Sequence, residues 1–227
     1  MRSTPAIPFP HQLPASLYPE SLATTSSAPE KLFVCGTLPR LMPPAVAVVG
    51  SRRASPLGRR QAHELGRQLG EAGLVVVSGL ARGIDSCALE GCLRGGGLAG
   101  AVLGNGLPTI YPSENEDLAT RMIRGGGFVI SEFEPDSPPR REHFPQRNRL
   151  ISALALAVVV VEATNRSGSL ITARWALRQG RDVCAFPGPV EGPQYQGCHR
   201  LIREGAALVT NVVEVLEVVA DLPPHSC

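Results

Sequence analysis

The sequence has no hydrophobic run long enough to cross a membrane, and no apolar segment near its N-terminus that could serve as a secretion signal. Its cysteines form no Cys-x-x-Cys pair and no His/Cys cluster at the spacing of a zinc site. The six cysteines are scattered, several of them within apolar runs: Cys35, Cys87, Cys92, Cys184, Cys198 and Cys227. Reduced thiols in a hydrophobic core are their expected state. We therefore expect a cytoplasmic protein that binds neither a membrane nor a metal.

Lysine is almost missing, because Lys31 is the only lysine among 22 basic residues. The simplest interpretation of this bias is genomic base composition. It still means that an anion-binding site in this protein will be made of guanidinium groups, which can donate two parallel hydrogen bonds to one anion. The net charge of +2 is too small to indicate a nucleic-acid partner by itself.

Length and composition indicate a single domain. A chain of 227 residues with 43% hydrophobic residues is long enough to bury the core of one α/β domain. Residues 1–30 are rich in proline, serine and threonine, and are predicted to be a tail or the remnant of a linker. The domain is predicted to cover residues 31–220, followed by a short C-terminal tail over residues 221–227.

From residue 32 onward, short apolar runs alternate with helical patterns. Runs typical of buried strands occupy residues 32–36, 45–49, 74–77, 98–103, 128–130, 158–161, 182–186 and 207–210. Amphipathic segments and helix-ending glycines, such as Gly73 after the first long helix, separate most of these runs. Strands that alternate with helices predict an α/β fold with a doubly wound, mostly parallel sheet.

Arginine side chains follow several of these strands. Arg52, Arg82 and Arg166 each lie in a loop after a predicted strand, and Arg147 and Arg149 lie shortly before the strand at 158–161. In a doubly wound sheet, ligands bind beyond the carboxyl ends of the strands. Five guanidinium groups are therefore predicted to meet along one edge of the sheet, which suits a polyanion better than a small neutral metabolite.

Three segments near these arginines have the character of anion-binding elements. The turn at residues 167–169 is predicted to join a strand to a helix and to leave backbone N–H groups free for a phosphate. The segment 144–149 combines guanidinium, amide and aromatic groups that could hold a phosphate and a stacked base together. Gly79 and Gly83 let a third turn approach a ligand closely, and Asp85 is expected to cap the helix that follows it.

The same loops do not match common cofactor or catalytic motifs. Gly50-Ser51-Arg52 occupies the position of a dinucleotide fingerprint but lacks its glycine pattern, and the strand at 74–77 ends in Ser78 rather than in an acidic residue. Neither a nicotinamide nor another cofactor is therefore expected. The five histidines are spread along the chain without a neighbouring nucleophile, and the acidic cluster Glu132, Glu134 and Asp136 is interpreted as a solvated loop. The sequence predicts no enzyme.

Taken together, the motifs resemble the DprA/Smf family of DNA-processing proteins, with the same order and spacing over about residues 32–218. The matching segments are Gly50-Ser-Arg52, Ser78-Gly-Leu-Ala-Arg-Gly-Ile-Asp85, Phe144-Pro-Gln-Arg-Asn-Arg149, Val160-Val-Glu-Ala163, Ser167-Gly-Ser-Leu-Ile-Thr-Ala173, Pro187-Gly188 and Gly197-Cys-His-Arg-Leu-Ile-Arg-Glu-Gly-Ala206. The resemblance implies an extended Rossmann fold that binds single-stranded DNA, forms a homodimer, helps to load the RecA recombinase onto single strands and performs no catalysis.

The resemblance also implies which residues contact DNA, with the arginines on phosphates and Phe144 stacked on a base. The predicted DNA-binding residues are Gly50, Ser51, Arg52, Gly79, Arg82, Phe144, Arg147, Asn148, Arg149, Arg166, Ser167, Gly168 and Ser169. The predicted dimer contacts lie in the last helix–strand unit and are His199, Leu201, Ile202 and Leu208. The three apolar members of this group could equally be core residues.

Two other functions remain open from the sequence. The lysine-decarboxylase-like phosphoribohydrolases, which cleave nucleoside monophosphates, have a related fold with a glycine-rich turn in the place of residues 167–173. Their turn is followed by a helix glutamate, whereas this chain has Leu170, Ile171, Thr172 and Ala173 there. The second alternative is a nucleotide-sensing module that binds a mononucleotide and signals through a partner protein.

Overall fold

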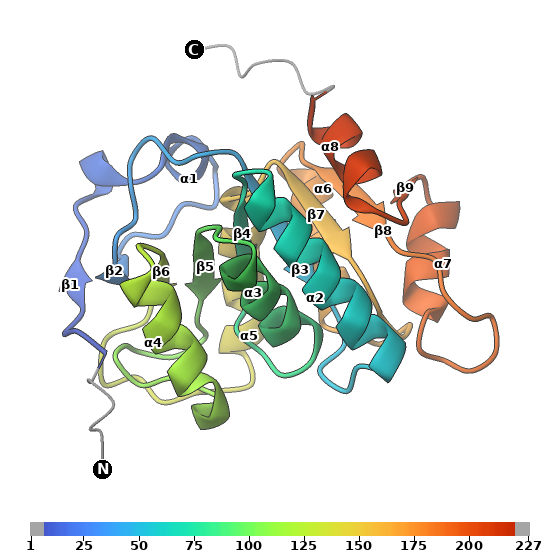
Figure 1. Cartoon of the computed structure of the whole chain (residues 1–227). Coiled ribbons are helices and arrows are strands. Elements are labelled where there is room, and N and C mark those ends of the chain that lie inside the picture. The colour runs from blue at the N-terminus through green and yellow to red at the C-terminus, as the bar shows by residue number, and fades with distance from the viewer. Residues whose placement is uncertain (1–6, 221–227) are drawn as a thin grey trace.

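A nine-stranded sheet forms the centre of the protein, with helices on both of its faces (Figure 1). The computed structural model describes residues 7–220. The strands are β1 (His11–Gln12), β2 (Phe33–Gly36), β3 (Ala45–Val49), β4 (Val75–Ser78), β5 (Ala99–Val102), β6 (Phe128–Ser131), β7 (Ala157–Val160), β8 (Asp182–Ala185) and β9 (Ala207–Leu208). Their order is β1-β2-β6-β5-β4-β3-β7-β8-β9. Only the β1–β2 and β2–β6 pairs of this sheet are antiparallel, which confirms the predicted α/β fold with a Rossmann-like, mostly parallel sheet.

The helices form two layers. One layer contains α2 (Pro56–Glu71), α3 (Ile84–Arg94), α4 (Glu116–Arg124) and α8 (Val212–Ala220). The other contains α1 (Glu20–Ala23), α5 (His143–Ala153), α6 (Ser169–Arg178) and α7 (Gln196–Arg203). Two short 3-10 helices, η1 (Ala15–Leu17) and η2 (Ser113–Asn115), lie in the connections. No helix within residues 7–220 is both long enough and apolar enough to span a membrane.

The central strands are apolar on both sides because each side faces a helical layer. All five residues of β3 are buried. Val46 and Val48 pack into the core beneath α2 and α3, whereas Ala47 and Val49 pack into the core beneath α5 and α6. Side chains alternate across a strand, so an unbroken apolar run is what a strand covered on both faces requires.

Helices α2 and α3 approach each other closely enough that their backbones touch. A Cβ atom added at Gly66 of α2 would overlap the carbonyl group of Ala88, and one added at Gly91 of α3 would overlap that of His63. The glycines therefore let the two helix backbones come into direct contact, with no side chain between them at these positions. This contact also sets the distance between the loops that precede the two helices, and both of those loops belong to the candidate site.

Residues 7–30 are folded onto the domain and differ from the tail that the composition predicted. Strand β1 pairs with β2, and Leu13, Tyr18 and Leu22 are buried in the core on the α5 side of the sheet. The prolines of this segment prevent a long helix but leave its apolar side chains free to pack in short pieces. The predicted C-terminal tail at 221–227 lies outside the described residues, as do residues 1–6.

Helix α5 was not predicted from the sequence, which suggested only a short polar segment before β7. The helix starts at His143 and runs to Ala153, and the apolar run before β7 begins in its last turn. Pro145 lies in the first turn of α5, where a backbone N–H has no intrahelical partner, so a proline is tolerated there. The helix places successive residues of this segment on different faces, which decides their roles.

Candidate functional site

A cavity opens where the chain connections leave two neighbouring strands, β3 and β7, in opposite directions along the sheet. Strand β3 continues through α2 to β4 on one side, whereas β7 continues through α6 to β8 on the other. The loops that follow β3 and β7 border a cavity of about 660 Å³ at the carboxyl ends of the strands. Such a switch point is where doubly wound sheets bind their ligands.

Most of the predicted DNA-binding residues meet at this place. The larger cavity is lined by Gly50, Ser51, Arg52, Phe144, Arg147, Asn148, Ser167, Gly168 and Ser169. A smaller cavity of about 240 Å³ adjoins it and is lined by Gly79 and Arg82, together with Arg52, Phe144 and Arg147 from the first group. Of the predicted residues, Arg149 and Arg166 line neither cavity.

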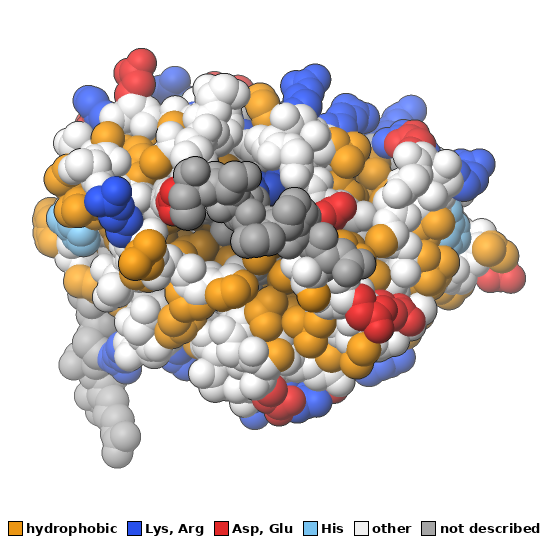
Figure 2. All heavy atoms as spheres, turned by 90° about the horizontal axis from the view of Figure 1, so that it is seen from above, with side chains coloured by type: hydrophobic (Ala, Val, Ile, Leu, Met, Phe, Trp, Pro, Cys, Tyr) orange, Lys and Arg blue, Asp and Glu red, His pale blue; other side chains and the backbone are white. Residues whose placement is uncertain are grey.

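The opposite end of the sheet has a different character. Figure 2 looks from above onto the end where the parallel strands begin, and shows many apolar side chains, with blue Lys and Arg side chains mainly around the border. A cavity of about 510 Å³ at this end is lined mainly by the segments 19–24, 40–45 and 154–156. The aromatic, glycine and arginine residues singled out in the sequence lie at the other end of the sheet.

The carboxylate of Glu162 holds the loop that carries Arg52. Glu162 is fully buried and accepts hydrogen bonds from the backbone N–H of Ser55 (3.0 Å) and from its Oγ (2.5 Å). Its backbone carbonyl accepts a further bond from the N–H of Ser51 (2.7 Å). The negative charge lies at the N-terminus of α2, where the helix dipole favours it. The loop is thus fixed at both ends, while Arg52 and Arg53 between them are exposed.

The neighbouring turn after β4 is held by Asp85, although not in the way that the sequence suggested. Asp85 was expected to cap α3, but its Oδ2 accepts hydrogen bonds from the N–H groups of Gly79 (3.1 Å) and Ala81 (3.4 Å) in the preceding turn. Burial raises the pKa of Asp85. Leu80 adopts a positive φ of 53°, an uncommon conformation for a residue with a side chain. The turn leaves Arg82 exposed at its tip.

Arg147 is a buried structural residue rather than an exposed cation. Its side chain donates to the carbonyls of Gly79 (2.9 Å) and Val102 and to Oδ1 of Asn148 (3.0 Å). Burial lowers the pKa of Arg147 to about 10. A Cβ atom at Gly79 would overlap the guanidinium group, so the glycine makes room for it. Arg147 therefore connects α5 to the ends of β4 and β5.

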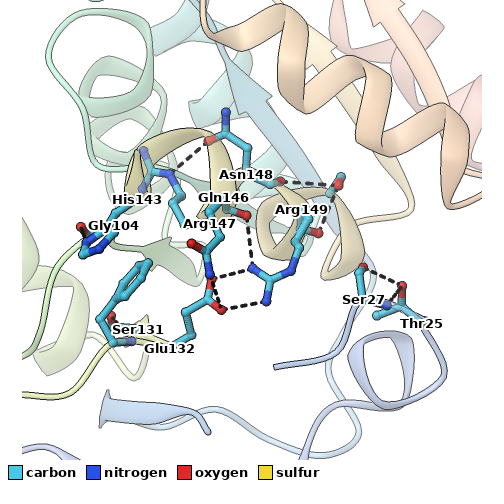
Figure 3. Close-up of polar contacts among 12 residues, drawn as sticks. Thr25, Ser27, Gly104, Ser131, Glu132, His143, Gln146, Arg147, Asn148 and Arg149 are labelled. Atoms are coloured by element: carbon cyan, nitrogen blue, oxygen red, sulfur yellow. Dashed lines mark hydrogen bonds and ion pairs between the residues drawn. The ribbon is translucent and has the colours of Figure 1, made fainter. Parts of the chain in front are cut away.

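Arg149 points away from the cavity, which corrects the predicted rim of five free guanidinium groups. Its Nη1 and Nη2 lie 2.5 and 2.6 Å from the two carboxylate oxygens of Glu132, and the two side chains are only 14% and 9% exposed. Figure 3 shows Arg149 and Glu132 facing each other while Asn148 projects from the other side of α5. A bidentate pair with this little solvent contact has few donors left for a ligand.

Arg82 and Arg166, two more of the predicted DNA-binding arginines, are exposed at the surface. Arg82 forms a bidentate pair with Glu114 (2.7 and 2.6 Å), but both side chains are more than half exposed. Exposed pairs contribute little stability, so Glu114 can be exchanged for another anion. Arg166 is exposed in the loop before α6, next to the turn that lines the larger cavity.

The turn before α6 lines the cavity, but the N–H groups that follow it are not free as the sequence predicted. Those of Ser169, Leu170 and Ile171 donate to Oγ of Ser167 and to the carbonyls of Ser167 and Gly168. Gly168 precedes the helix without a capping side chain, and Oγ of Ser167 and Oγ of Ser169 are 2.7 Å apart. Nδ2 of Asn148 donates to the carbonyl of Gly168 (3.3 Å), which ties the turn to α5. A helix N-terminus at the rim of a cavity favours an anionic ligand.

The structure adds residues that the sequence did not single out. Arg53, Tyr111 and Arg141 line the larger cavity, and Arg53 and Tyr111 also line the smaller one. Arg53 could have been included from its position beside Arg52, whereas Arg141 and Tyr111 lie in proline-rich loops without a recognisable pattern. Among the described residues that line the two cavities, Asp85 carries the only carboxylate, and it is used within the turn. No cluster of three potential metal ligands occurs within residues 7–220.

The predicted dimer contacts have unequal exposure. Leu201 is buried in the core beneath α7, and Ile202 is partly buried against the same core. His199 is partly exposed, with Nε2 3.2 Å from the carbonyl oxygen of Gly188. Leu208 on the edge strand β9 is 51% exposed. Of the three apolar residues, Leu208 therefore has the most surface available to a partner.

Comparison with known proteins identifies the family to which the chain is similar. A sequence model of the family described as DNA recombination-mediator protein A matches residues 12–220. Protein Smf of Escherichia coli is 48% identical over 212 residues, which cover 92% of this chain and 57% of that protein. DNA processing protein DprA of Streptococcus pneumoniae is 46% identical over 199 residues, which cover 88% of this chain and 70% of that protein.

Solved structures are similar over nearly the whole chain. DprA of Streptococcus pneumoniae superimposes with a TM-score of 0.86 at 41% identity, covering 96% of this chain and 76% of that one. DprA of Helicobacter pylori, whose structure concerns its mode of binding single-stranded DNA, has a TM-score of 0.82 at 28% identity and covers 93% of this chain and 95% of that one. A molybdenum cofactor carrier protein of Chlamydomonas reinhardtii (TM-score 0.52, 17% identity, 79% and 98% covered) shares the fold alone.

The nearly buried pair of Arg149 and the exposed pair of Arg82 predict different effects of substitution on stability. Replacing Arg149 with alanine leaves the carboxylate of Glu132 nearly buried without its partner. We expect the free energy of unfolding, measured by urea denaturation, to fall by about 3 kcal/mol. Arg82→Ala opens an exposed pair and should change it by less than about 1 kcal/mol. Equally small losses for both variants would show that Arg149 does not hold α5 in place.

Proposed function

The chain belongs to the DNA recombination-mediator protein A (DprA/Smf) family, and on this premise we propose that it binds single-stranded DNA independently of sequence. The family is one of recombination mediators rather than of enzymes. The observation that carries the proposal is the meeting of exposed guanidinium groups and aromatic rings at the two adjoining cavities. A single strand offers phosphates and unstacked bases side by side, and this combination of groups suits both.

The exposed cations are the proposed phosphate contacts. Arg52, Arg53 and Arg82 come from the loops after β3 and β4, and Arg141 comes from the loop before α5. The turn before α6 adds the hydroxyl groups of Ser167 and Ser169 on the far side of the larger cavity. Such contacts recognise the backbone of a strand and do not distinguish bases. The guanidinium carbon of Arg52 also lies 5.0 Å from the ring centre of Phe144, which links the cationic and aromatic parts of the site.

The DNA-binding proposal predicts a strong dependence on salt. Affinity for fluorescent oligo-dT, measured by anisotropy over a series of salt concentrations, should fall with a log–log slope of about −0.7 for each phosphate neutralised. The double variant Arg52→Ala/Arg82→Ala should bind more weakly and with a slope that is shallower by about 1.4, because two contacts are lost. The matched control is Arg124→Ala, which removes an exposed arginine from the C-terminus of α4 at the other end of the sheet. Unchanged affinity of the double variant would refute the assigned site.

A role in loading RecA is the second part of the proposal. It is supported by the family's description as a recombination mediator, and a partner of RecA would act in the cytoplasm. We expect this chain to increase the rate at which RecA forms joint molecules on single strands coated with single-strand-binding protein. The Arg52→Ala/Arg82→Ala variant should give no increase, because it no longer holds the strand. A wild-type chain that binds oligo-dT but leaves the RecA rate unchanged would contradict this role.

The third part is a homodimer formed through α7 and β9. Leu208 is exposed on the edge strand, and the partly exposed Ile202 and His199 lie on the helix before it, with the buried Leu201 supporting them. Light scattering after size exclusion should give twice the 24.0 kDa of one chain for the wild type. Leu208→Arg should shift the mass to that of one chain, whereas Leu41→Arg, at an exposed leucine between β2 and β3, should not. A monomeric wild type, or a dimeric Leu208→Arg variant, would exclude this interface.

A further inference from the structure

Two aromatic rings lie next to each other where the two cavities of the candidate site meet. The ring centres of Tyr111 and Phe144 are 5.7 Å apart, with an angle of 40° between the ring planes. Both residues line the larger and the smaller cavity. They differ in their surroundings, and this difference decides which of them can accept a base.

The ring of Phe144 is partly covered by the protein itself. The guanidinium group of Arg52 lies over it, with 5.0 Å from the guanidinium carbon to the ring centre. Gly104 packs beside the ring so closely that a Cβ atom there would lie 3.0 Å from its Cδ1. Phe144 therefore has protein groups on two sides of its ring, and Arg52 must move before a base can stack on the face that it covers.

Tyr111, in contrast, combines an exposed ring with a fixed backbone. Its residue surface is 43% exposed. The residues on either side of it, Ile110 and Pro112, are both buried. Nδ2 of Asn105 donates to the carbonyl of Thr109 (2.8 Å), which holds the loop from its start. A rigid aromatic side chain loses little conformational freedom when it binds, so this arrangement prepares Tyr111 for contact with a ligand.

Cationic groups line the same cavity as Tyr111. The smaller cavity of about 240 Å³ contains Tyr111 together with Arg52, Arg53 and Arg82. A base on the ring would therefore leave its flanking phosphates facing guanidinium groups. Stacking on an aromatic ring accepts every base, because each base has a π face.

From these observations, and resting on the proposed single-strand binding, we propose that Tyr111 is the residue on which a base of the bound strand stacks, with Phe144 supporting its ring from the side. The assignment adds a contact to the site and changes the role of Phe144 from the main stacking surface to that of a support.

The test combines direct detection of the contact with affinity measurements. Oligo-dT containing one 5-iodouracil is bound to the wild-type chain and irradiated, and the cross-linked residue is identified by mass spectrometry. We expect the cross-link at Tyr111. Tyr111→Ala and Tyr111→Leu should weaken oligo-dT binding by about 5- to 150-fold, the range that corresponds to the loss of one stacked base. Tyr111→Phe keeps the ring and should bind like the wild type.

The outcomes separate this inference from the proposed function. Tyr111 is exposed, so all three variants should keep the wild-type melting curve, which circular dichroism checks. If the wild-type chain does not bind oligo-dT, the proposed function fails and the inference fails with it. If the wild type binds but Tyr111→Ala and Tyr111→Leu bind equally well, or the cross-link forms only at Phe144, single-strand binding stands and the role of Tyr111 is overturned.

Discussion

The buried guanidinium group of Arg147 is the contact on which the shape of the candidate site depends. From α5 it reaches the carbonyl groups of Gly79 and Val102 at the ends of two neighbouring strands, and it orients Asn148 toward the turn before α6. A charge removed from water is tolerated only when hydrogen bonds replace its hydration, and here carbonyl groups at the strand ends do so. One side chain therefore connects the elements whose loops enclose the cavities.

Burial divides the arginines of this region into two groups with different roles. Arg147 and Arg149 are desolvated and bonded to the protein, so their donors maintain the structure. Arg52 and Arg82 lie in exposed loops, where they keep their hydration and can exchange a weak partner for a phosphate. Arginines from the same region of the structure thus either stabilise the fold or remain available to a ligand, depending on how far each side chain is exposed to solvent.

The groups that line the resulting site are those that the proposed binding of a single strand requires. Exposed cations, two aromatic rings and a helix N-terminus surround it, and the one carboxylate among the described lining residues, that of Asp85, is bonded within its own turn. The chain spans 57% of Escherichia coli Smf, and the segment that matches the family contains this whole arrangement. The proposed site for a single strand therefore lies within the segment that this chain shares with the family.

Hydrophobic periodicity and turn residues in the sequence were enough to determine the layered α/β fold and the loops at the strand ends, because both depend on short-range pattern. They placed Arg52, Arg82 and the turn at 167–169 correctly at one end of the sheet. Only the tertiary structure decided that Arg149 pairs with Glu132, that Tyr111 reaches the site and that residues 7–30 join the core. The physical reason is that ion pairing and desolvation depend on groups that are separated in the chain. Arg149 and Glu132 are 17 residues apart, and no local sequence pattern predicts their contact.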